Sequence, residues 1–468
     1  LPKEYEDIIS RLQDFSKIPE AMVGPELTKT MRPYQQEGVN WLAFLYRNRF
    51  GACLADDMGV GKTLQVIALL SALKSARIPP HKAYTNVPHL IVVPPSLLFN
   101  WQHEISRFAP ELTVYEYTGN LRTDSFKGSD IILSTYDIVR RDAVKLSAKR
   151  FHIIVFDEAQ SVKNIRAART SAVRKLQGAF HICLTGTPVE NHVGEYYSII
   201  DLAVPGLLGE YHEFLDDNRS GDHQRTVAKT KMFVLRRTKA AVLKDLPAKL
   251  ESDIYLDMDD MQKEFYTRMV SEVREEVAQA YQIRPQAQAG IAALAAILRL
   301  RQICITPALI DDTHTAISPK FSYLVEKVRE IAQEGNAALI FSQFTSVLDL
   351  LEKELDTEHV PFVRLDGSTP TKKRKGLVAA FQDPAGPPVF LISLKAGGFG
   401  LNLTRASYVF HLDPWWNPAV EQQAADRAHR IGQTNKVIVQ RLLMHHTIEE
   451  KMMVLKERKK DLYRKLMD

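Results

Sequence analysis

A glycine-rich segment, Asp57–Thr63, has residue types that suit a phosphate-binding loop. It reads Asp-Met-Gly-Val-Gly-Lys-Thr. Gly59 and Gly61 permit the backbone to curl so that several N–H groups face one anion. A helix expected to begin near Lys62 adds the partial positive charge of its N-terminus. Lys62 would supply a cation to the β and γ phosphates of a nucleotide, and the hydroxyl of Thr63 would bind Mg²⁺.

The segment departs at one position from the strict phosphate-loop pattern. Asp56 stands where that pattern has its first glycine. A glycine turn with a solvated lysine is therefore the alternative interpretation of the segment taken alone. In the context of the whole chain we predict that it binds ATP. The residues predicted to do so are Asp57, Met58, Gly59, Val60, Gly61, Lys62 and Thr63.

An acidic pair, Asp157 and Glu158, follows the apolar run Ile153–Phe156. Carboxylates at the end of a buried strand are costly unless they serve a ligand. Asp157 is suited to hold Mg²⁺ and Glu158 to polarise an attacking water, although such pairs also cap helices. Combined with the glycine segment, the pair predicts that Lys62, Asp157 and Glu158 are catalytic and that Thr63 and Asp157 are the metal ligands.

Two arginines far downstream have the chemistry to act on the same phosphate. The segment Gln423–Gln433 reads Gln-Ala-Ala-Asp-Arg-Ala-His-Arg-Ile-Gly-Gln. Arg427 and Arg430 are three residues apart, so on a helix they share one face, with Gln423 on nearly the same stripe. A guanidinium spreads over phosphate oxygens, and such an arginine contributes ~10³–10⁵ in rate in other NTPases. We predict that all three residues are catalytic; a basic surface helix is the alternative.

The elements that must position these residues form two series of short apolar runs, which alternate with helix-length segments. Runs rich in Val and Ile with this spacing predict buried parallel strands, and two series predict two α/β lobes. The first series is Ala52–Ala55, Leu90–Val93, Ile131–Ser134, Ile153–Phe156 and Ile182–Leu184. The second is Ala338–Phe341, Phe362–Leu365, Val389–Ser393, Tyr408–Leu412 and Val437–Val439.

Helical segments are expected outside these series. Met261–Arg301 is rich in Ala, Gln, Glu, Arg and Leu, a composition that favours helix. Ile8–Phe15 predicts a short helix, and Ile448–Met467 predicts a brace helix whose apolar seam is Val454, Leu462 and Leu466. The predicted boundaries are 1–26 for a helical lead-in, 27–240 for lobe one with a helical protrusion near 192–235, 241–445 for lobe two with a protrusion near 258–315, and 446–468 for the brace.

The composition is that of a globular protein. Of 468 residues, 45% are hydrophobic and 25% charged, which excludes wholesale disorder. The net charge of +5 is too small to establish a polyanion partner, although Lys451–Asp468 holds seven basic and three acidic residues. Three scattered cysteines predict a reducing compartment. No apolar run approaches ~20 residues, so no membrane span is expected. The N-terminus lacks signal-peptide character and a starting Met, so we expect a fragment of a longer protein.

Taken in order along the chain, the motifs resemble the ATPase core of the SWI/SNF-type chromatin-remodeller and DNA-translocase family, within helicase superfamily two. Asp57–Thr63 resembles its motif I and Gln423–Gln433 its motif VI. The other matching segments are Met31–Leu42 ahead of motif I, Ile91–Ser96 (motif Ia), Leu184–Asn191 (motif III), Phe233–Lys239 (leading out of lobe one), Leu339–Phe344 (motif IV), Ser393–Leu403 (motif V) and Asp413–Pro418.

The resemblance implies two tandem RecA-like lobes that use ATP and Mg²⁺, with Gln35 contacting adenine. One departure is Gln160, where the family more often has His. Glutamine keeps a donor and an acceptor but cannot titrate, so the connection to motif III is expected to differ while hydrolysis is retained. The modest insertions and the lack of a chromatin-reading module resemble a bacterial or archaeal member, which would be cytoplasmic at the nucleoid; a eukaryotic member would be nuclear.

The resemblance further implies a monomeric ATP-dependent translocase on double-stranded DNA that displaces or remodels protein–DNA complexes without separating strands. Phosphate contacts would give little sequence specificity. Residues expected to contact DNA are Pro94, Ser96, Ser134, Thr135, Lys395, Gly397 and Gly398. Trp415 and Trp416 are expected to form a rigid loop rather than to stack on bases. The alternatives are a strand-separating helicase and an ATP-regulated scaffold on RNA polymerase or another DNA-bound complex.

Overall fold

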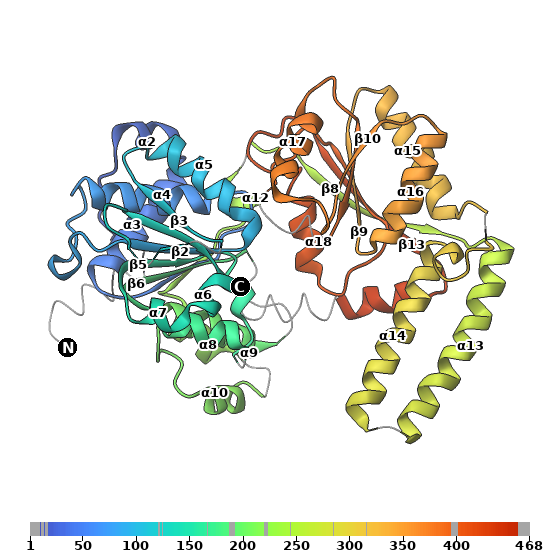
Figure 1. The fold of residues 1–468 in the computed structure, drawn as a ribbon, viewed down its shortest axis with the longest axis horizontal. Coiled ribbons are helices and arrows are strands. Elements are labelled where there is room, and N and C mark those ends of the chain that lie inside the picture. Colours follow the sequence, from blue (N-terminus) through green and yellow to red (C-terminus); the bar gives the residue numbers. More distant parts are fainter. Residues whose placement is uncertain are drawn as a thin grey trace. The chain divides into compact units, whose positions relative to one another are not determined.

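The computed structural model describes Ser10, Asp14 and residues 17–119, 122–123, 125–165, 167–186, 192–219, 223–243, 245–283, 285–314, 316–394 and 401–456, without the side chains at 96, 287, 371 and 372. The chain divides between residues 244 and 245 into two compact units. Each unit is an α/β body built on its own sheet (Figure 1). The α/β class and the two lobes predicted from the apolar runs are confirmed.

The sheet of the first unit has seven parallel strands in the order β3-β4-β2-β5-β6-β1-β7. Parallel strands covered on both faces must be apolar throughout, and β2, β4 and nearly all of β5 are buried at every position. The strands are β1 Ala52–Leu54, β2 His89–Val93, β3 Val114–Tyr117, β4 Ile131–Thr135, β5 Arg150–Phe156, β6 Gln177–Leu184 and β7 Val234–Leu235. All five apolar runs of the first series are therefore strands.

Helices lie on both sides of this sheet, with α3–α5 on one side and α6–α9 on the other (Figure 1). The helices are α2 Pro25–Thr30, α3 Pro33–Arg47, α4 Lys62–Lys74, α5 Leu98–Phe108, α6 Tyr136–Arg141, α7 Ala143–Ser147, α8 Ala168–Arg174, α9 Val193–Ala203, α10 Tyr211–Asp217, α11 Gln224–Thr230 and α12 Lys239–Val242. The first part of the protrusion expected near 192–235 is not peripheral, because Ile199, Ile200 and Leu202 of α9 belong to the core of the unit.

The sheet of the second unit has six parallel strands in the order β10-β11-β9-β12-β13-β8. Successive side chains of a strand point to opposite faces. Accordingly Val389 and Leu391 pack in one core cluster, while Phe390 and Ile392 pack in another. The strands are β8 Lys249–Leu256, β9 Ala338–Ser342, β10 Phe362–Leu365, β11 Val389–Ser393, β12 Tyr408–His411 and β13 Val437–Met444. The second series of runs is thus also confirmed.

Two long helices of the second unit form a hairpin that projects from the sheet (Figure 1). They are α13 Asp260–Ile283 and α14 Gln286–Ile305, which share a small apolar core of their own. The remaining helices are α15 Pro319–Gln333, α16 Thr345–Thr357, α17 Thr371–Gln382 and α18 Pro418–Ala425. Residues 448–456 are also helical. The expected helix Ile8–Phe15 lies almost wholly outside the described residues, as do Leu462 and Leu466 of the expected brace, while Val454 is exposed.

One segment of α14, Gln288–Ile305, is long and apolar enough to cross a membrane by length and composition, with a mean hydropathy of 1.4. Arg299 and Arg301 interrupt its apolar run, which is why the sequence was expected to hold no such segment. Ala296, Leu300 and Ile303 of this helix pack against α13. The same length and composition are found in helices that pack within a protein core.

Candidate nucleotide site

The glycine segment forms a tight loop between β1 and α4. Gly59 and Gly61 have φ angles of 81° and 84°, a region that favours glycine. A Cβ built on Gly61 would lie 2.3 Å from Nε2 of Gln35, so a larger residue would collide there. Both glycines of the segment are therefore required by the backbone, and the loop leads directly into the N-terminus of α4 at Lys62.

Lys62 and Thr63 begin α4, a helix whose first turn is not capped by a side chain. The Lys62 ammonium donates to the backbone carbonyls of Asp56 (2.6 Å) and Asp57 (3.1 Å). The loop thus holds a lysine, a threonine hydroxyl and uncapped helical N–H groups together, a donor set that fits a triphosphate. Val60 is buried, whereas Met58 is half-buried beside Gly186.

Two side chains of α3 hold the loop from behind. Tyr34 Oη and Gln35 Nε2 both donate to the carbonyl of Val60, at 2.7 and 2.9 Å. Gln35 also accepts from the backbone N–H of Arg32 at 2.9 Å and is almost fully buried. Its amide group is therefore committed to the loop in this structure, and its contact with adenine stays a prediction.

Asp56, the residue that breaks the phosphate-loop pattern, has a structural partner. Its carboxylate is completely buried and accepts from Arg237 Nη2 (2.5 Å) and Nε (3.1 Å). Arg237 also donates to Gln65 Oε1 of α4 at 2.8 Å. The next carboxylate, that of Asp57, accepts from the backbone N–H of Lys239 at 2.9 Å. The segment after β7 thereby fixes the start of the loop, a role of Arg237 that sequence reasoning missed because it lies 181 residues from Asp56.

The acidic pair lies at the carboxyl end of β5. Asp157 accepts from the indole N–H of Trp101 (2.7 Å) and from the backbone N–H of Glu158 (2.8 Å), and Tyr136 donates to its carbonyl. Burial raises the pKa of Asp157, while the Trp101 hydrogen bond and the charge of Lys62 lower it. The effect of burial is the largest, so the pKa of Asp157 lies above its usual value.

Glu158 has a left-handed backbone conformation, with φ of 48°. This conformation is uncommon outside glycine and is retained where the surrounding structure enforces it. The Glu158 carboxylate accepts from Gln160 Nε2, and Gln160 Oε1 accepts from Thr185 Oγ1 at 2.8 Å. Gln160 thus uses its donor and its acceptor to join the acidic pair to the end of β6, where the segment resembling motif III begins; residues 187–191 of that segment lie outside the described residues.

In the second unit, the prediction that Arg427 and Arg430 share one face of a helix is wrong. Helix α18 ends at Ala425, so it contains Gln423 but neither Arg427 nor Arg430. Both arginines lie in successive turns, in which Arg427 N–H bonds to the carbonyl of Ala424 and Arg430 N–H to that of Ala428. Arg427 is almost fully buried and Arg430 half-buried. After these turns, the side chain of Gln433 donates to the carbonyls of Ala406 and Ala428.

Of the residues expected to contact DNA, some are buried and others lie outside the described residues. Ser134 is fully buried and its hydroxyl donates to the carbonyl of Tyr117 at 2.8 Å, so its contact with DNA stays a prediction. Thr135 is buried and its hydroxyl caps α6, and Pro94 is buried. Ser134 and Thr135 are the last two residues of β4, and Pro94 directly follows β2. All three thus have roles in the fold at the ends of buried strands. The side chain of Ser96 and residues Lys395, Gly397 and Gly398 lie outside what the structure describes.

The three cysteines, Cys53, Cys183 and Cys304, are buried free thiols. The tryptophan pair behaves as expected for a packed loop: Trp415 packs against the core of the second unit, and the guanidinium of Arg301 lies 5.5 Å from the ring of Trp416.

Comparison with known proteins assigns both parts of the chain. A family described as SNF2-related domain matches residues 34–309, and one described as helicase conserved C-terminal domain matches residues 319–432. Together these matches span the glycine loop, the acidic pair and the segment after α18 that holds Arg427 and Arg430 (residues 426–430, the arginine segment).

Individual relatives agree with these matches. A Bacillus subtilis protein described as an ATP-dependent helicase/translocase, YwqA, is 37% identical over 99% of this chain and 51% of its own length. The human SWI/SNF-related matrix-associated actin-dependent regulator of chromatin subfamily A member 1 is 35% identical over 92% of this chain and 42% of its own. The chain thus spans about half the length of the curated relatives it matches. Among solved structures, the Sulfolobus solfataricus SWI2/SNF2 ATPase core in complex with dsDNA is 34% identical over 96% of this chain and 95% of that chain, with a TM-score of 0.47.

Proposed function

The chain belongs to the SNF2-related family of helicase-like ATPases, and on this premise we propose that it is an ATP-dependent translocase on double-stranded DNA that displaces or remodels protein–DNA complexes without separating the strands. The observation that carries this proposal is the glycine loop of the first unit, in which Gly61, Lys62 and Thr63 form a phosphate cradle. Asp157 and Glu158 directly follow strand β5 of the same sheet. All strands of this sheet are parallel, so their carboxyl ends share one edge, where ligands bind in such folds.

In the proposed reaction, the loop N–H groups and Lys62 hold the triphosphate. Glu158 orients the attacking water and accepts its proton, and Gln160 fixes the carboxylate for this task. Mg²⁺, for which Thr63 and Asp157 are the fitting ligands, would neutralise charge on the phosphate oxygens. Trp101 supports this role, because its hydrogen bond fixes one oxygen of Asp157 and leaves the other near the Glu158 N–H.

The second unit would contribute Gln423, Arg427 and Arg430. Guanidinium groups bind phosphate oxygens in a planar, bidentate manner, so they suit the charge that develops on the transferred phosphoryl group. The arginines can contact the γ phosphate before hydrolysis but not after it. ATP therefore stabilises the state of the protein in which this contact is made, and ADP does not. Alternation between these states while the protein holds DNA would move it along the duplex.

Duplex DNA is proposed as the polymer because one relative of known structure, 34% identical to this chain, is described as an ATPase core in complex with dsDNA. Contacts to phosphates would make binding insensitive to sequence and strongly dependent on salt, with a log–log slope of roughly −0.9 per neutralised phosphate.

Displacement of a third strand from a DNA triplex tests translocation without strand separation. We expect ATP-dependent release of the third strand from a triplex and no unwinding of a tailed duplex. Unwinding of the tailed duplex would instead indicate a strand-separating helicase. ATP turnover that rises only with a protein partner, and not with duplex alone, would indicate a regulated scaffold.

A further inference from the structure

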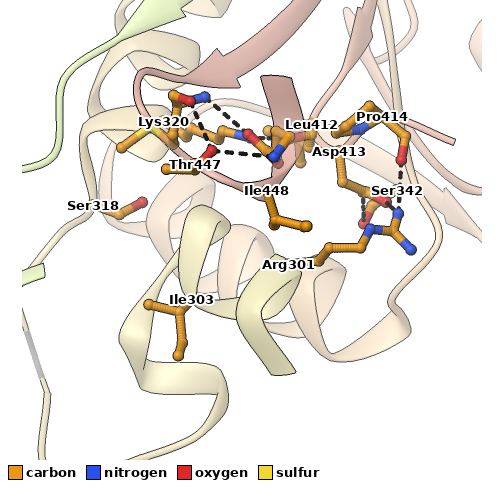
Figure 2. Close-up of polar contacts among 12 residues, drawn as sticks. Arg301, Ile303, Ser318, Lys320, Ser342, Leu412, Asp413, Pro414, Thr447 and Ile448 are labelled. Carbon is orange, nitrogen blue, oxygen red and sulfur yellow. Dashed lines mark hydrogen bonds and ion pairs between the residues drawn. The ribbon is translucent and has the colours of Figure 1, made fainter. Parts of the chain in front are cut away.

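A buried arginine joins the helical hairpin to the loop ahead of the arginine segment. Arg301 of α14 is 1% exposed. Its Nη2 donates to the carbonyl of Pro414 at 2.7 Å and lies 3.5 Å from Asp413 Oδ2 (Figure 2). Its Nη1 donates to Gln343 Oε1 at 3.2 Å. One guanidinium therefore contacts the segments that follow two neighbouring strands, β9 and β12.

Asp413, the partner of Arg301, is fully buried and has two further donors. Ser342 Oγ donates to its Oδ1 at 2.7 Å (Figure 2). The backbone N–H of Gln343 donates to the same oxygen at 3.3 Å. Burial raises the pKa of Asp413 to about 6, although Arg301 and Ser342 lower it. The carboxyl group is thus ionised at neutral pH and pairs with the arginine.

The contact continues from this loop into α18. The backbone N–H of Trp415, next to Pro414, donates to Glu421 Oε1 of α18 at 2.7 Å. Asn417 caps the start of the same helix. Glu421 is held in turn by Lys456 at 2.5 Å, a pair that is almost completely buried. A short series of hydrogen bonds therefore leads from α14 to the helix that contains Gln423.

An arginine is not the residue that stability alone would favour at this place. A buried ion pair recovers little of the cost of removing both charges from water, and apolar residues of similar volume often serve stability as well or better. A guanidinium does, however, fix the direction of several acceptors at once because its five donors form a rigid fork. The geometry at Arg301 is of this kind, since its acceptors come from two separate loops.

We propose that Arg301 is a positioning residue for ATP hydrolysis, which fixes the loop 413–417 on α14 and thereby sets the place of Arg427 and Arg430. This inference rests on the proposed function, in which those two arginines act on the γ phosphate. It adds that the α13–α14 hairpin and the arginine segment are coupled through one side chain.

The test compares two Arg→Lys variants two residues apart on α14. Arg301→Lys keeps the charge but loses the fork, whereas Arg299→Lys changes only an ion pair with Glu276 inside the hairpin and is the matched control. The double variant Arg301→Met/Asp413→Asn removes both charges, so no unpaired charge is left buried. It replaces Arg301→Lys in the test if that variant does not fold. For each protein, kcat and KM for ATP are measured with linear duplex DNA, together with amide hydrogen exchange over residues 412–425 without nucleotide.

We expect Arg301→Lys and the double variant to lower kcat by about 10- to 100-fold, the effect of a small displacement of catalytic groups. Their KM for ATP should stay within about twofold, because most of the proposed contacts to the nucleotide come from the glycine loop of the first unit. Exchange over 412–425 should accelerate in both, and Arg299→Lys should match the wild type in all three readouts.

Wild-type kcat in a folded Arg301 variant would overturn the proposal, as would equal effects of Arg301→Lys and Arg299→Lys. Unchanged exchange over 412–425 in either Arg301 variant would also overturn it. If duplex DNA does not stimulate the wild-type protein, the proposed function fails, and the exchange comparison still decides whether Arg301 positions the loop.

Discussion

The glycine loop of the first unit and the arginine segment of the second unit are held in place in different ways. The loop is fixed mainly by its own glycines, by the helix that follows it and by hydrogen bonds from α3 and the residues after β7. The arginine segment follows α18, a helix of eight residues. Arg301 fixes the loop before this helix through Asp413, which lies 112 residues further along the chain. Lys456 fixes the carboxylate of Glu421 within the helix.

This difference predicts which residues can be changed without unfolding the protein. Lys62, Thr63 and Glu158 are half-buried, so their side chains are partly accessible. By contrast, Arg301, Lys320 and Asp413 are inaccessible and their charges depend on one another or on a partner in the core. Local motifs thus supply the chemistry, while long-range buried pairs set where that chemistry is presented.

The largest expected effect is on the arginine segment. Removing the charge in Arg430→Ala should lower ATP turnover by ~10³–10⁵, the contribution of an arginine finger in other NTPases, with a smaller change in ATP affinity. Arg427→Ala should do the same but also destabilise the fold, because Arg427 is almost fully buried. Turnover and nucleotide binding measured side by side check this. Arg329→Ala, which removes an exposed ion pair with Glu358, is the control; a similar loss there would contradict a specific role.

The acidic pair should respond nearly as strongly. Glu158→Gln keeps the shape of the side chain but not its basicity, so turnover should fall by ~10²–10⁴, the usual contribution of a general base. ATP binding, measured by titration, should persist. Glu104→Gln on α5 of the same unit should leave turnover unchanged. Full activity in Glu158→Gln would show that another group orients the water.

Two lysines separate chemistry from stability. Lys320 is fully buried and donates to both carboxylate oxygens of Glu449 (2.8 and 2.9 Å) and to the carbonyl of Leu412 (Figure 2). Lys320→Met leaves Glu449 buried and unpaired, which should cost ~3–5 kcal/mol of unfolding free energy. Lys62→Met should cost far less stability and yet abolish turnover. Denaturant unfolding and ATPase assays on both proteins check the contrast.

The control for this prediction is the double variant Lys320→Met/Glu449→Gln, which removes both charges and should recover most of the lost stability. If the single and double variants were equally unstable, loss of packing rather than an uncompensated charge would be the cause.

Acid should weaken the second unit through His411. Burial lowers the pKa of His411 to about 4, and its ring lies among Glu421, Lys456, Arg441 and Glu251. An unfolded histidine binds its proton near pH 6.5. Between about pH 6.5 and about pH 4, the imidazole is therefore protonated in the unfolded state but neutral in the folded state, which favours unfolding. Between pH 7 and pH 5 this should cost about 2 kcal/mol of unfolding free energy. Denaturant unfolding at both pH values, with His411→Gln as the comparison, checks it; an unchanged pH dependence in that variant would contradict the assignment.

The smallest expected effect is at Gln160. Removal of its side chain in Gln160→Ala breaks the bridge from Thr185 to Glu158. One hydrogen bond contributes about 1 kcal/mol, which corresponds to about a fivefold loss in turnover. Gln160→His should retain more activity than Gln160→Ala, since a histidine also offers a donor and an acceptor. Steady-state kinetics on the two variants decide whether the bridge acts on the reaction.

Much of the fold could be predicted from the sequence because buried parallel strands are apolar at every position. All ten apolar runs are strands. The three strands that the pattern missed are short or lie at sheet edges: β3 and β8 alternate with exposed polar residues, and β7 has two residues. At such places apolar content is low, and pairing with a neighbour determines the conformation.

The site could be predicted where its chemistry is local. The glycine loop and the acidic pair each occupy consecutive residues, so residue type and spacing were sufficient. The end of α18 was not predictable from spacing, since an i, i+3 pair fits both a helix and a turn. The pairs Arg237–Asp56 and Arg301–Asp413 are brought together only by the fold. The hydrogen bond of Ser134 within the sheet was not predictable either, because a polar residue at a strand end can serve a ligand or the sheet.

The most direct test of the central claim is ATP turnover by the purified protein in low-salt magnesium buffer, with linear duplex DNA, single-stranded DNA, RNA or no polymer. If hydrolysis at the glycine loop is coupled to movement on a duplex, turnover rises many-fold with duplex DNA and much less with the other polymers, and Lys62→Ala abolishes it. Equal turnover with and without duplex DNA would contradict the account.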